Sequence, residues 1–181
     1  MIIILLIIVG VLVWGIISYN NFVKLKNNVK EAFATMEVYF KKRFDLIPNL
    51  VETVKGYTQH EKTTLENVVK ARNQLTNVQN ISEQVDAENL LNESLKSLFA
   101  LSESYPDLKA NQNFKDLQNQ LNQIEDDIAN ARKYYNGSVK QLNTACEKFP
   151  GVIIAKLFHF ETMPMYQVTN DEERENVKVK F

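Results

Sequence analysis

The feature that most constrains this chain is an uncharged, apolar run at its N-terminus. Residues 2–17 are all apolar or glycine, and no formally charged side chain occurs before Lys24. The run has about the length needed to cross roughly 30 Å of hydrocarbon as a helix that rises about 1.5 Å per residue. A buried core helix rarely lacks a polar face altogether. We therefore predict that residues 1–19 are a transmembrane anchor.

The flanks of this run favour a retained anchor over a signal peptide that is removed. Trp14 and Tyr19 lie near its C-terminal end, where amphipathic aromatic side chains favour the lipid headgroups. A cleavable signal would show a positively charged start and a small-residue cleavage motif, and neither occurs. The single cysteine, Cys146, excludes an intrachain disulfide and a cysteine-based metal site. The lipid bilayer is thus the first expected partner.

Charge and composition restrict the rest of the chain. The 21 Lys and Arg residues balance 22 Asp and Glu residues, so no basic excess indicates a nucleic-acid partner. Only five Gly and four Pro interrupt a sequence dominated by helical periodicity. We predict an all-α fold, in which the transmembrane helix continues into an elongated antiparallel up-down bundle of about four long helices over residues 20–149.

Local signals divide this bundle into helices. Asp45 is the expected N-cap of the second helix, with Pro48 in its first turn, where the missing N–H has no intrahelical partner to lose. Ser82 is the expected cap of the third helix. The fourth helix shows an unbroken seam in steps of three and four, which needs a packing partner along its whole length. The seam consists of Phe114, Leu117, Leu121, Ile124, Ile128, Ala131, Tyr135, Ser138, Leu142, Ala145 and Phe149.

The chain after the bundle contains an apolar segment, residues 150–160, and a charged tail, residues 161–181. Helix lengths return the apolar segment to the membrane surface. It either contacts lipid or another subunit, with Lys156 reaching toward the headgroups, or it forms a short helix that folds back onto the bundle. The expected membrane-proximal residues are Trp14, Tyr19, Ile153, Ile154, Leu157 and Phe158.

The most specific sequence block is RFDLIPNLVETVKGY at residues 43–57. It is followed by His60 and Glu61, Leu65, and Ala71 with Arg72, and later by Phe149 with Pro150 and by AKLF at residues 155–158. With these blocks in this order, the chain resembles the bacterial LemA proteins. The resemblance implies an N-terminal anchor followed by a helical bundle. One departure is His159, which stands where these proteins usually have Gly.

The resemblance also bears on location. It implies a single-pass protein of the bacterial inner membrane. The positive-inside rule would place Lys24, Lys26 and Lys30 in the cytoplasm. Relatives with a lipoprotein-like start at the equivalent place must present this domain outside the cytoplasm, however. We expect the domain to lie outside.

Residues 43–57 and the motif that follows them could also contain a metal-binding or catalytic site. Glu52, His60 and Glu61 are candidate ligands of a divalent cation, because carboxylates and imidazoles bind such ions. Glu52 and His60 would lie about 12 Å apart along a helix, however, so one ion could not be held by both without other helices. HExxH, GxSxG and Gly-rich phosphate motifs do not occur. We therefore expect that the protein is not an enzyme and that it has no catalytic residue and no cofactor.

A structural role is the alternative for the same block. Arg43, Asp45, Asn49 and Glu52 would form a polar network at the start of a helix. A buried charge must be paired, and Asp45 or Glu52 is the expected partner of Arg43.

The long seam and the surplus of apolar surface lead to a hypothesis about function. We expect a membrane-anchored scaffold that forms a large homo-oligomer, with Gly10 and Gly15 as close-contact positions between anchors. The alternatives are a divalent-cation-handling protein and an accessory or adaptor protein for a membrane protease or transporter, which would bind other membrane proteins.

Overall fold

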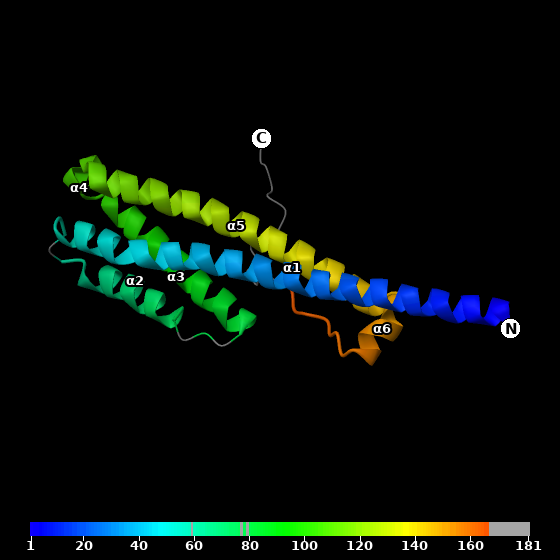
Figure 1. Cartoon of the computed structure of the whole chain (residues 1–181). Helices are drawn as coiled ribbons and strands as arrows, with labels where there is room; N and C mark the ends of the chain where they lie inside the picture. Colours follow the sequence, from blue (N-terminus) through cyan, green and yellow to red (C-terminus); the bar gives the residue numbers. More distant parts are fainter. Residues whose placement is uncertain (59, 77, 79, 167–181) are drawn as a thin grey trace, which may run out of the picture. The chain divides into compact units, whose positions relative to one another are not determined.

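The computed structural model describes residues 1–166 except 59, 77 and 79, and all the described elements are α-helices (Figure 1). They are α1 (Ile2–Lys55), α2 (Lys62–Gln74), α3 (Ile81–Ser102), α4 (Pro106–Ala110), α5 (Gln112–Glu147) and α6 (Gly151–Leu157). The predicted all-α fold with a long N-terminal helix is confirmed. Most of the predicted charged tail lies outside the described residues.

The apolar start of α1 has the properties of a membrane-spanning segment. Within the described part of the chain, α1 is the one helix long and apolar enough to cross a membrane. Its large apolar side chains at residues 2–17 are all exposed rather than packed in a core. Exposed apolar surface of this extent is stable in lipid and not in water.

The predicted helix break at Asp45 is wrong, because α1 continues through it and contains Pro48. A proline inside a helix costs about 3 kcal/mol. Burial of an aliphatic side chain stabilises by about 1.5–3 kcal/mol, and three of them, Ile47, Leu50 and Val54, are fully buried on one face here. The tertiary packing therefore outweighs the local signal.

Two other predicted boundaries also change. The expected second helix is divided, because α1 ends at Lys55 and α2 begins at Lys62. The cap of α3 is Asn80 and not Ser82. The Asn80 side-chain oxygen accepts a hydrogen bond from the backbone N–H of Glu83 at 2.9 Å, while its amide nitrogen donates to the Glu83 carboxylate at 2.7 Å. The first bond satisfies a backbone N–H group at the start of the helix, and the second joins the side chains of Asn80 and Glu83.

The chain forms two compact units. The first unit comprises residues 1–41 and 124–165, and the second comprises residues 42–123 with Tyr166. Within the first unit the two long helices run side by side (Figure 1), and the rings of Phe33 and Tyr135 lie 5.9 Å apart. Within the second unit α2 packs against α3. The second unit's core includes Ile47, Leu50, Val54, Val68, Ala71, Leu91, Leu95, Leu98, Leu108, Phe114 and Leu121.

The predicted seam of the fourth helix is largely confirmed as the buried stripe of α5. Its members from Leu121 to Ala145 are buried, as is Phe114, whereas Leu117 is partly buried. Phe149 differs, because it follows the end of the helix and is 80% exposed. Other parts of the same chain therefore cover most of this stripe.

The end of the first unit is fastened to α5 by hydrogen bonds. The Asn143 side chain donates to the backbone carbonyl of Met163 at 2.9 Å and accepts the Met163 N–H at 2.8 Å. The Tyr135 hydroxyl donates to the carbonyl of Pro164 at 3.0 Å. Burial raises the pKa of Tyr135 above its ordinary value, which keeps this donor protonated.

A strained residue terminates α6. The N–H of Phe160 donates to the carbonyl of Ala155 at 2.9 Å, which is the long bond of a Schellman motif. His159 occupies the left-handed position of this motif with φ of 56°. Glycine is the usual residue there, because a Cβ is disfavoured at positive φ.

We predict that His159→Gly stabilises the protein by about 1 kcal/mol, because glycine relieves the left-handed strain. Thermal unfolding of the full-length protein in detergent, followed by circular dichroism, measures the change. His159→Ala is the matched control, since it removes the imidazole and keeps the strain. Equal stability of the Gly and Ala variants would contradict the prediction.

Candidate functional site

The junction between α1 and α2 depends on Pro48. A proline has no N–H, so the carbonyl four residues earlier, that of Phe44, loses its bond within α1. Arg72 of α2 replaces that bond, because its Nε donates to the Phe44 carbonyl at 3.1 Å. The guanidinium carbon of Arg72 also lies 3.5 Å from the centroid of the Phe44 ring. One arginine thus satisfies the carbonyl and makes a cation–π contact with the same residue.

The four residues predicted to form a polar network lie in two environments. Arg43 is buried, with 5% of its surface exposed, and donates a hydrogen bond to the side-chain oxygen of Asn92 on α3. Glu88, one turn before Asn92 on α3, is also buried. Sequence spacing could not reveal these two residues, because α3 lies far along the chain from the block.

The other three predicted members of the network lie at the surface. Asp45, Asn49 and Glu52 are exposed on α1. Glu52 pairs with Lys55 at 3.4 Å, where both side chains are largely in solvent. An exposed pair of this kind contributes little to stability.

The loop that follows α1 is held by side chains of the later helices. The Asn111 amide donates to the Tyr57 hydroxyl at 2.8 Å, and its oxygen accepts the N–H of Phe114 at 2.9 Å, which caps α5. The Tyr105 hydroxyl donates to the Glu61 carboxylate at 3.5 Å. These contacts fix the direction in which the chain enters α2.

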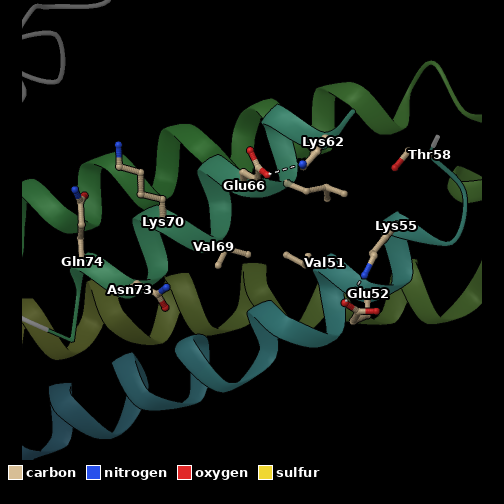
Figure 2. A pocket seen from close by; sticks show the side chains of 11 residues that line it. Val51, Glu52, Lys55, Thr58, Lys62, Glu66, Val69, Lys70, Asn73 and Gln74 are labelled. Atoms are coloured by element: carbon tan, nitrogen blue, oxygen red, sulfur yellow. Dashed lines mark hydrogen bonds and ion pairs between the residues drawn. The ribbon is translucent and has the colours of Figure 1, made fainter. Parts of the chain in front are cut away.

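A groove with an apolar floor lies between the last turns of α1 and the whole length of α2. It has a volume of about 850 Å³. Figure 2 shows Val51 of α1 and Val69 of α2 between the two helices, with charged side chains on both sides. Leu65 completes the floor, and Thr58 lies at one end with its hydroxyl bonded to the carbonyl of Val54 at 3.2 Å.

The rim of this groove carries charged side chains that form only exposed ion pairs. Lys62 and Glu66 of α2 form an ion pair at 3.6 Å, and their side chains are 85% and 64% exposed. Glu52 and Lys55 form the pair on the α1 side. Because such exposed pairs are weak, they do not close the floor against an incoming apolar side chain.

The candidate cation ligands do not converge. Glu52 lies on α1, exposed His60 lies in the loop before α2, and Glu61 accepts the bond from Tyr105. In the described part of the chain, no group of three or more His, Cys, Asp or Glu side chains is placed to hold a metal ion. A cation site at these residues stays a prediction.

Cys146 does not provide a reactive thiol. It is buried, and its sulfur lies 3.8 Å from the carbonyl of Phe160. Burial raises the pKa of this thiol, and the negative charge of Glu147 raises it further. A protonated, buried thiol is a poor nucleophile.

Among the predicted membrane-proximal residues in and after α6, three are exposed and one is buried. Ile153, Leu157 and Phe158 are 51%, 65% and 47% exposed, whereas Ile154 is buried. Tyr19 lies against Phe158, with ring centroids 4.8 Å apart. The segment therefore forms a short helix that folds back onto the chain with one side and remains exposed on the other.

Comparison with known proteins gives one consistent match. The family model described as LemA family matches residues 32–181. The chain is also similar to the protein described as Protein LemA of Metamycoplasma hominis, with 21% identity over 154 residues that cover 84% of this chain and 70% of that protein. The family match includes Phe44, Pro48 and Arg72 and both helical segments that line the groove.

We predict that Arg72→Met destabilises the protein by about 2 kcal/mol, because it leaves the Phe44 carbonyl without a donor and removes the cation–π contact. In a Pro48→Ala background, the new N–H can bond that carbonyl. The cost of Arg72→Met should then fall by about 1 kcal/mol. Denaturant unfolding of the four proteins of this double-mutant cycle measures the difference.

Lys70→Met is the control for loss of charge on the same helix, since Lys70 is exposed, and we expect almost no change in stability. Additive effects of Arg72→Met and Pro48→Ala would show that the arginine does not compensate for the proline.

Proposed function

The chain belongs to the LemA family, and we propose that it is a membrane-anchored scaffold that self-associates into a large homo-oligomer on the bacterial membrane. The observation that carries this proposal is the groove between α1 and α2. Val69 on its floor is 39% exposed, and the volume of the groove is large enough to receive several side chains of a second copy.

The anchor supports this proposal in a second way. Copies held in one bilayer share an orientation, and their confinement raises the effective concentration of each binding surface. A groove on one copy that receives a different surface of the next is a heterologous contact, and such contacts close into rings or extend as open arrays. A Cβ added at Gly10 or Gly15 would meet no atom within 4 Å beyond the adjacent residues and the local helix backbone, which leaves room for close approach of neighbouring anchors.

The α5 seam does not support self-association. Its residues from Leu121 to Ala145 are buried within the chain, as is Phe114, so they are not available to a second copy. The proposal therefore rests on the groove and on the anchor.

We further propose that the domain lies outside the cytoplasm, on the outer side of the inner membrane. The support for this orientation is the resemblance to the LemA proteins, which implies relatives whose lipoprotein-like start requires export. Protease added to spheroplasts should then digest the domain, and full protection until the membrane is lysed would reverse the orientation.

Self-association predicts that the full-length protein in detergent has a mass many times that of the 20.9 kDa chain. Light scattering, corrected for bound detergent, measures this mass. Val69→Lys places a charge on the floor of the groove and should shift the protein toward smaller species. A wild-type protein that is monomeric at micromolar concentration would contradict the proposal.

Val38→Lys is the matched control. Val38 is 55% exposed on α1 and does not line the groove, whereas Val69 is 39% exposed within it. The control should assemble as the wild type does. Equal loss of assembly in both variants would show that the groove has no special role.

A further inference from the structure

A cluster of exposed apolar side chains surrounds α6. Phe149 is 80% exposed just before the helix, Ile153 and Leu157 are 51% and 65% exposed on one of its faces, and Phe158 is 47% exposed after it. Ile153 and Leu157 are four residues apart and therefore lie on the same side of the helix. We call these four side chains the α6 apolar face. Four large apolar residues within ten positions exceed what a water-exposed segment normally carries.

The α6 apolar face lies beside the end of the membrane anchor. Tyr19 is the second residue after the apolar run of α1, and its ring lies 4.8 Å from that of Phe158 and 5.7 Å from that of Phe160. Phe22, one turn further along α1, stacks on Phe160 at 4.9 Å with an interplanar angle of 18°. These contacts lie within one unit and fix α6 at the level where α1 leaves the hydrocarbon.

The fold prevents α6 from turning its apolar face inward. Ile154 and Ala155 already occupy the inner side and are buried. A Cβ added to Gly151 would lie 2.6 Å from the backbone carbonyl oxygen of Ala145, so the start of α6 is pressed directly against α5. The bonds between Asn143 and Met163 hold the chain that follows.

Lysine side chains near this segment fit a phospholipid surface. Residues 148–160 contain Lys148 and Lys156 and no carboxylate, whereas Glu147 and Glu161 flank this range. Both lysines are exposed, and Lys24 is exposed on α1 shortly after the apolar run. Lysines beside an apolar face favour anionic headgroups while their stems remain against the acyl boundary.

We propose that the α6 apolar face is a second membrane contact, which inserts among the phospholipid headgroups of the leaflet from which α1 emerges. The occupant of this face is therefore lipid, because the face is continuous with the anchor through Tyr19 and Phe158. This inference rests on the anchoring part of the proposed function and adds a surface to it. A second contact restricts rotation of the first unit about the axis of α1, so each copy presents a constant side to its neighbours.

The test uses the full-length protein in vesicles of phosphatidylcholine and phosphatidylglycerol. Cys146→Ala removes the native thiol, and Leu157→Cys supplies a site for an environment-sensitive fluorophore. Val38→Cys is the matched control, because Val38 is similarly exposed and lies 19 residues beyond Tyr19 on α1, or roughly 28 Å along the helix. Brominated lipids and aqueous iodide are the two quenchers.

The α6 contact predicts that the fluorophore at position 157 is quenched by brominated lipid several-fold more than the fluorophore at position 38. Iodide should show the opposite order. Quenching of both positions by iodide alone would overturn the inference. Protection of position 157 from both quenchers would also overturn it, since another protein chain would then cover the face.

Failure of this inference is separable from failure of the scaffold proposal. Light scattering on the same labelled variants reports assembly independently of quenching. An assembled protein with position 157 in water would exclude the lipid contact alone. A monomeric protein with position 157 in lipid would exclude self-association alone.

Discussion

The second unit depends on how one backbone carbonyl is satisfied. Pro48 interrupts the hydrogen bonds of α1 but not its course, so the carbonyl of Phe44 must find a donor outside the helix. Arg72 supplies that donor and covers the ring of the same residue. This bond and the burial of Val68 and Ala71 in the core together hold α2 in place, and the groove lies between α2 and the end of α1. A proline that would end most helices thus creates the site at which a second helix docks.

The apolar run of α1 and α6 form the second surface to which we assign a function. The exposed run of α1 is long and apolar enough to cross a membrane, and the aromatic contacts of Tyr19 and Phe22 hold Phe158 and Phe160 beside the end of this run. A scaffold needs a defined orientation as well as binding surfaces. In the proposed scaffold, the anchor would supply confinement to two dimensions, the α6 contact rotational restraint, and the groove a surface for the next copy.

The sequence predicted the features that depend on a single helix. The length of the apolar run predicted the anchor, the spacing of apolar residues predicted the α5 stripe, and both agree with the structure. The predicted break at Asp45 failed because local capping and proline signals act against burial of three core side chains, which only the tertiary structure supplies. The partnership of Arg43 with Asn92 and the groove itself depend on helices that meet across long sequence separations. A continuous helix through Pro48 would have predicted that the Phe44 carbonyl needs an outside donor, but that Arg72 is this donor depends on where α2 packs.

The central claim is that the bond from Arg72 to Phe44 holds α2 in place and so maintains the groove. Amide hydrogen exchange of the full-length Arg72→Lys protein tests it most directly, because lysine keeps the charge and loses the planar donor. The account predicts faster exchange throughout α2, with unchanged protection around Val29 and Met36 in the first unit. Protection of α2 equal to that of the wild type would contradict it.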